Sequence, residues 1–133
     1  MNRPLRYLLW TLTVAYMLAI YYLSSASDIG ASIPLENGLD KILHAVEYAG
    51  LAMLWHASLR ATAYHWNRNQ CASLAFAVAS MYALSDELHQ SYVPLRTSSV
   101  YDLAADVAGA LVVLMIFTGF LWKREHIHHR RRA

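Results

Sequence analysis

Residues 40–51 read DKILHAVEYAGL and open the second of four apolar segments in this 133-residue chain. Asp40, His44, Glu47 and Tyr48 recur at the spacing of one helical face. Ionisable groups inside a membrane-length helix are costly, so they mark either a functional site or an internal ion-pair network. The stretch therefore indicates a membrane-embedded helix with one polar face.

The composition of the whole chain supports a membrane protein. Hydrophobic residues make up 57% of it and charged residues 15%, against about 45–50% and about 25% in soluble domains. Four apolar segments have roughly the 17–25 residues that span a bilayer and predict helices at about 7–23, 42–59, 71–90 and 101–122. We therefore predict one all-α domain (1–133), an integral membrane bundle of four transmembrane helices.

The first segment has an alternative interpretation as a cleavable signal peptide. Arg3 and Arg6 form a basic start, and residues 25–27 read SAS, which suits a cleavage site. However, the apolar run exceeds the roughly 7–15 residues of a signal-peptide core, which favours an uncleaved helix.

The basic residues predict the orientation in the membrane. All lysines and arginines except Lys41 and Arg96 fall on one side if the chain crosses four times. The positive-inside rule then places both termini, and a basic tail at 123–133, in the cytoplasm. The outer loops are 24–39 and 91–99. Lys41 and Arg96 lie on the outer side beside acidic residues, so each is expected to be a site residue or a counter-ion.

Polar side chains form stripes near the outer ends of three predicted helices. Spacings of three and four residues place the members of each stripe together on its helix. Because none of them tolerates lipid, the simplest packing turns the stripes inward, forming a polar pocket open to the outer surface. The pocket members are Asp40, Lys41, His44, Glu47 and Tyr48, then Asp86, Glu87, His89 and Gln90, then Arg96 and Ser99 of the linker, and Asp102 and Asp106.

These residues resemble the VanZ-like family, which is named for a teicoplanin-resistance protein. The matching blocks are Asp40-Lys41-x-x-His44-x-x-Glu47-Tyr48-x-x-Leu51, Ser85-Asp86-Glu87-x-His89-Gln90 with Pro94-x-Arg96-x-x-Ser99, and Asp102-x-x-x-Asp106-x-x-Gly109. The resemblance implies a multi-pass protein of the bacterial inner membrane with a role in the cell envelope. It leaves the chemistry, and any link to teicoplanin resistance, open.

The chain departs from the usual pattern of the family at two positions. The family usually has Pro-Gly-Arg where this chain has Pro94-Leu95-Arg96, and Asn where this chain has Asp106. The second change adds a negative charge to the predicted pocket, which bears on its preference for ligands or cations.

One hypothesis is a hydrolase or transferase that acts on a lipid-linked envelope substrate. The histidines would be acid and base, with His44 oriented by Asp40 and His89 by Asp86. The catalytic assignments are His44, His89, Asp86, Glu87 and Asp102. The substrate-binding assignments are Asp40, Lys41, Glu47, Tyr48, Gln90, Arg96, Ser99 and Asp106, with the two cations holding a phosphate or carboxylate.

Other interpretations of the pocket stay open. The two histidines with Asp86, Glu87 or Asp102 form a donor set for a divalent metal, although their spacing matches no compact metal motif. The pocket is otherwise a non-catalytic binding or accessory site, or a structural network of charges.

The expected partners are membrane lipids and a lipid-linked envelope substrate. The sequence has no Gly-x-Ser-x-Gly elbow and no P-loop, which disfavours a serine hydrolase and a nucleotide enzyme. A few terminal arginines do not make a nucleic-acid-binding fold. Transport is disfavoured because the polar groups stop in the outer half of the membrane. The oligomeric state is not determined by the sequence.

Overall fold

The computed structural model describes residues 3–26, 38–96 and 98–130, with the backbone alone for residues 120–130. Within these ranges the chain forms helices α1 (Arg3–Ser25), α3 (Leu39–Thr62), α4 (Arg68–Gln90) and α5 (Val100–Arg130), and no strand. Each of the four expected segments lies inside one of these helices, so the all-α class is confirmed. Residues 27–37 of the expected outer loop and residues 131–133 of the expected tail lie outside the described residues.

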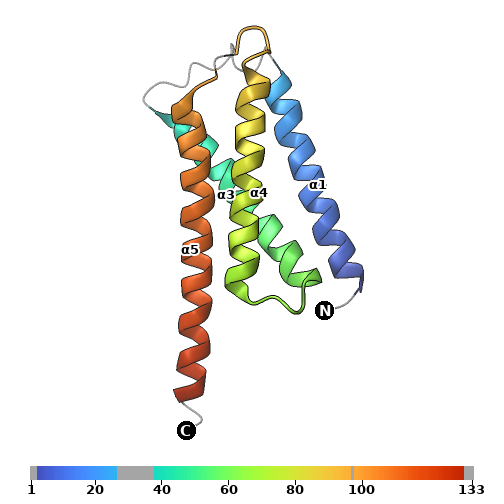
Figure 1. Cartoon of the computed structure of the whole chain (residues 1–133), viewed down its shortest axis with the longest axis vertical. Coiled ribbons are helices and arrows are strands. Elements are labelled where there is room, and N and C mark those ends of the chain that lie inside the picture. Colours follow the sequence, from blue (N-terminus) through green and yellow to red (C-terminus); the bar gives the residue numbers. More distant parts are fainter. Residues whose placement is uncertain (1–2, 27–37, 97, 131–133) are drawn as a thin grey trace.

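The helices lie side by side and alternate in direction, so both chain ends are at the same end of the bundle (Figure 1). Helix α3 is central, because it contacts α1, α4 and α5. The backbone of α5 continues as a helix through residues 123–130, where the basic tail was expected, and extends beyond the other helices. The end of the bundle that holds the starts of α3 and α5 and the end of α4 is called the site end below.

Local signals in the sequence set the helix boundaries. Helix α4 begins with a capping box, in which the Asn67 side chain accepts from the backbone N–H of Gln70 and the Gln70 side chain accepts from that of Asn67, both at 2.9 Å. Helix α3 begins after Gly38, which has a φ of 78° that glycine adopts without strain.

Small residues allow the helices to approach closely. A Cβ atom at Gly109 of α5 would lie 2.0 Å from the carbonyl oxygen of Ala45 in α3, so the two backbones are almost in contact there. This contact sets the relative height of α3 and α5, and with it the positions of the polar groups one turn away. A buried stripe on α4 consists of Cys71, Ala75, Ala79 and Ala83.

The outer faces of the helices are apolar. Two described helices are long and apolar enough to span a membrane, over Arg3–Ser25 and Val100–Gly119, with mean hydropathies of 1.4 and 2.0. Large hydrophobic side chains such as Leu18, Val46 and Met81 point outward. A soluble bundle would bury such side chains, whereas a bilayer is an apolar solvent for them.

Candidate functional site

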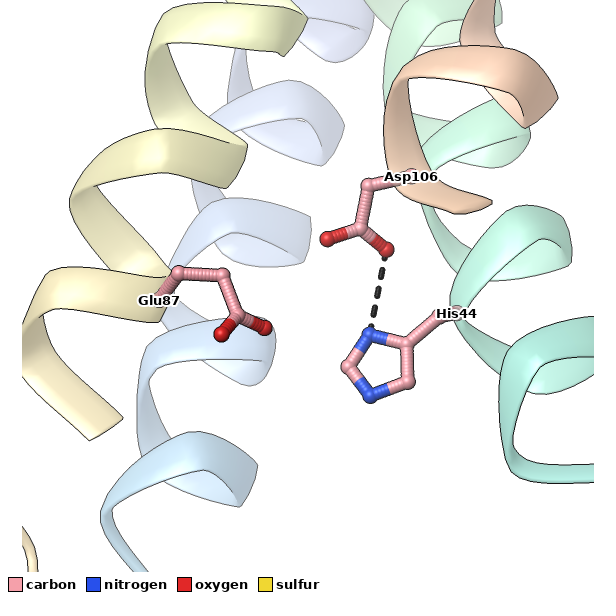
Figure 2. Close-up of side chains that lie close together, drawn as sticks. All are labelled: His44, Glu87 and Asp106. Carbon is pink, nitrogen blue, oxygen red and sulfur yellow. Dashed lines mark hydrogen bonds and ion pairs between the residues drawn. The ribbon is translucent and has the colours of Figure 1, made fainter. Parts of the chain in front are cut away.

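The centre of the site end is formed by His44 of α3, Asp106 of α5 and Glu87 of α4. Nδ1 of His44 lies 3.0 Å from Oδ1 of Asp106, and the Glu87 carboxyl group faces this pair from the opposite helix (Figure 2). One ligating atom from each residue lies within 4.8 Å of the others. Glu87 and Asp106 are buried and His44 is half-buried. We call these three residues the central triad.

Glu87 also fixes the start of α5. Its Oε2 atom accepts hydrogen bonds from the hydroxyl of Ser98 at 3.0 Å and from the backbone N–H of Ser99 at 2.8 Å. The hydroxyl of Ser99 in turn accepts from the N–H of Tyr101 at 3.2 Å, as an N-cap does. One carboxylate oxygen of Glu87 is therefore used by the fold, and the other is left for the triad.

Lys41 lies between two carboxylates at the start of α3. Its ammonium group donates to Asp40 at 2.8 Å and also to Asp102, which is buried at the start of α5. The hydrogen bond to Asp102 raises the pKa of Lys41, and the hydrogen bond from Lys41 lowers the pKa of Asp40, so both groups stay charged. The sequence left two roles open for Lys41, site residue or counter-ion. This arrangement favours the counter-ion role.

The orienting carboxylates differ from those that the sequence suggested. His44 is paired with Asp106, whereas Asp40 is bonded to Lys41. The Asp86 carboxylate accepts from the side chain of Gln90 at 3.0 Å. The difference arises because i, i+4 neighbours on one helix compete with partners that packing brings from another helix.

His89 faces α1 and not the central triad. Its Nε2 atom is 2.9 Å from the hydroxyl of Ser25, and its ring packs on Tyr21 with centroids 4.8 Å apart. Next to it, Gln90 donates to the hydroxyl of Ser24 at 2.7 Å. The structure thus brings His44, Glu87 and Asp106 together and places His89 in a second polar group.

Helix α1 therefore contributes to the site end, which the polar stripes of the other three helices did not indicate. Ser24 and Ser25 at the end of α1 were the available signal, because they are hydroxyl groups at the depth of the polar stripes.

Arg96 follows a tight turn that reaches over α1. The N–H of Arg96 donates to the carbonyl of Val93 at 3.2 Å, and Leu95 has a φ of 66°, which is the pattern of a type II turn with proline at its second position. The guanidinium group donates to the backbone carbonyl of Leu23 in α1, and its buried Nε atom has no partner among the described residues.

Two further predicted site residues lie one to two turns deeper on α3. Tyr48 is 1% exposed, and its buried hydroxyl has no partner among the described residues. Glu47 is half-buried, and its backbone carbonyl accepts from the hydroxyl of Tyr16 at 3.1 Å. Asp40, His44 and Glu47 are all half-buried, so the side of the site end that α3 forms is partly exposed.

Surface cavities lie at the opposite end of the bundle. The cavity between α4 and α5 has a volume of about 230 Å³ and is lined by apolar and neutral polar side chains, including Asn69, Phe76 and Leu114. It offers no carboxylate or imidazole. Chemistry that needs titratable groups is therefore favoured at the packed site end and not in this cavity.

Comparison with known proteins identifies the family of this chain. No curated protein and no solved structure matches the chain. The model of the VanZ/LLP1 family matches residues 5–123, a range that contains every residue of the central triad. The chain therefore belongs to the VanZ/LLP1 family.

Proposed function

We propose that this VanZ/LLP1 protein is a multi-pass protein of the bacterial inner membrane whose site end faces outward. In this arrangement all four helices span the bilayer and both termini are cytoplasmic. The site end binds the anionic head group of an envelope lipid or lipid-linked cell-wall component and acts on it. The proposal includes a contribution to teicoplanin resistance, which would follow from this role in the envelope.

The observation that carries the proposal is the burial of four acidic side chains from α4 and α5 at one end of the bundle. Asp86, Glu87, Asp102 and Asp106 are each at most 8% exposed. Charges at such depth are costly in a membrane protein, which is why they are typical of functional sites. Lys41 neutralises only part of this set, because it is bonded to Asp40 and Asp102.

The geometry supports one role for Arg96 and a different role for the central triad. At the site end, Arg96 is bonded to no carboxylate among the described residues, and guanidinium groups suit phosphate oxygens. The central triad supplies an imidazole and two carboxylates at the buried end, which is a donor set for acid–base or metal-assisted hydrolysis or transfer. The unpartnered hydroxyl of Tyr48 is a further group for binding a polar substrate.

A second candidate function is binding without chemistry. The pairing of Lys41 favours it, since this cation already serves as a counter-ion and much of the cluster is satisfied internally. In that case the site end is an accessory surface for a lipid head group, stabilised by a network of charges.

The test uses the purified full-length chain in nanodiscs that contain either phosphatidylglycerol or a polyprenyl diphosphate. Mass spectrometry measures both the lipid bound and the head group released. We expect binding that Arg96→Ala weakens at least tenfold and Arg96→Lys weakens less. We expect Asp106→Asn to slow head-group release at least tenfold at normal yield of folded protein. Binding without release selects the accessory role. Neither binding nor release by the wild-type protein rejects the proposal.

A further inference from the structure

Two buried carboxylate oxygens at the site end have no hydrogen-bond partner among the described residues. They are Oε1 of Glu87 and Oδ2 of Asp106. The residues are 4% and 1% exposed, so bulk water does not solvate these oxygens. A buried anionic oxygen without a partner is costly to the fold unless a cation or a proton is bound to it.

A third donor completes the arrangement. His44 lies across from Glu87, and one ligating atom of each of the three residues lies within 4.8 Å of the others (Figure 2). Two oxygen or nitrogen ligands at about 2.1 Å from one ion lie at most about 4.2 Å apart, so small side-chain rotations would suffice to hold an ion. The donors come from α3, α4 and α5, which fixes them against one another.

Within the described part of the chain, no basic side chain supplies the missing positive charge. Lys41 donates to Asp40 and Asp102, and Arg96 donates to the backbone carbonyl of Leu23. Two carboxylates at close range with one imidazole therefore form a site with an excess of negative charge. Such a site binds a divalent cation more strongly than a monovalent one, because the Coulomb attraction grows with charge.

We propose that His44, Glu87 and Asp106 bind one divalent first-row transition-metal ion, of the class of Mn²⁺ or Zn²⁺. Carboxylate oxygens suit Mn²⁺, and an imidazole extends the preference toward Zn²⁺, whereas Ca²⁺ prefers six to eight oxygens. The role of this ion in turnover rests on the proposed function. Binding of the ion itself does not, and it is measured without any lipid substrate.

The alternative to a metal ion is a proton shared between Glu87 and Asp106. A carboxyl pair that cannot ionise fully holds one proton in place of a cation. The two cases differ in a simple observable, because only the first gives a stoichiometric metal ion in the purified protein.

The experiment measures metal content in detergent solution. His126, His128 and His129 of the tail are first changed to Gln in the full-length chain, because three nearby imidazoles bind Zn²⁺ on their own. The protein is stripped with a chelator, equilibrated with Mn²⁺ or Zn²⁺, desalted and analysed by elemental mass spectrometry. The variants are Glu87→Gln, Asp106→Asn and His44→Gln, with His56→Gln as the matched control.

The two carboxylate variants, Glu87→Gln and Asp106→Asn, keep the structural hydrogen bonds. A glutamine oxygen at 87 still accepts from Ser98 and Ser99, and an asparagine oxygen at 106 still accepts from His44, while an amide NH₂ replaces the oxygen offered to the metal. The control residue His56 is also a buried histidine of α3, but it lies about three helical turns beyond His44 and packs edge-on against Phe117, so it does not belong to the triad.

We expect one ion per chain in the parent protein, which carries only the changes in the tail, and in His56→Gln. We expect at least tenfold weaker binding in each triad variant. A metal-dependent rise in unfolding temperature of the parent supplies a second measurement that does not depend on the folding of any variant. A parent protein without bound metal and without this rise overturns the proposal, as does equal binding in the triad variants. Metal binding without head-group release keeps the metal site and rejects only the enzymatic role.

Discussion

Gly109 of α5 packs directly on the backbone of Ala45 in α3, where a Cβ atom at position 109 would lie 2.0 Å from the Ala45 carbonyl oxygen. The neighbour of Ala45 is His44, and Asp106 lies one turn before Gly109 on α5. The close approach of the two backbones therefore brings the His44 and Asp106 side chains to 3.0 Å.

Gly109→Ala is expected to destabilise the bundle, because the opposing atom belongs to the backbone and cannot rotate away. Overpacking of this kind costs about 1–3 kcal/mol. The matched control is Gly119→Ala on the same helix, where a Cβ atom meets nothing within 4 Å and the higher helix propensity of alanine applies. Thermal unfolding in detergent compares them, and equal stability of both variants would contradict the contact.

Leu95→Gly is expected to stabilise the turn between α4 and α5. Leu95 has a φ of 66°, a conformation that costs a residue with a side chain about 1–2 kcal/mol and glycine almost nothing. Leu95→Ala keeps the strain and serves as the control. The measurements are the unfolding temperature and the rate of proteolysis within residues 91–99. An increase in stability of the alanine variant equal to that of the glycine variant would refute this explanation.

Lys41→Ala is expected to lower the yield of folded protein, because the buried Asp102 carboxylate loses its cation. An acceptor left unpaired in this way costs about 1–3 kcal/mol. Adding Asp102→Asn should recover most of the loss, giving strongly non-additive effects on stability. Additive effects would mean that the ion pair of Lys41 with Asp102 does not matter, and that Lys41 serves a ligand instead.

His44 and His89 are expected to act separately. His44→Ala combined with Asp106→Asn should lower head-group binding or release little more than either change alone, because both remove one unit. His89→Ala combined with Asp106→Asn should show additive effects, since His89 is bonded to Ser25 of α1. Non-additive effects of His89→Ala and Asp106→Asn would instead mean that both histidines belong to one functional site.

The orientation in the membrane has a direct test. Reporter fusions after Ala133 and at Gly38 should fall on opposite sides of the membrane if the chain crosses four times. The same side for both fusions would contradict the outward-facing site end. A fusion at His65, between α3 and α4, should share the side of the C-terminus.

The sequence by itself determined the helices, because apolar length and periodicity are local properties of the chain. It also indicated which end of α3, α4 and α5 carries the polar groups, as residues 40–51 show for α3.

Only the tertiary structure decided which polar groups meet. On a single helix Asp40 is as near to His44 as any acid, but the contact of Gly109 with Ala45 brings Asp106 to His44 and leaves Asp40 to Lys41. Helix α1 likewise takes His89 away from the triad through Ser25. Periodicity states which way a side chain faces, whereas the choice among partners on neighbouring helices depends on the height and rotation of each helix, which close packing of small residues fixes.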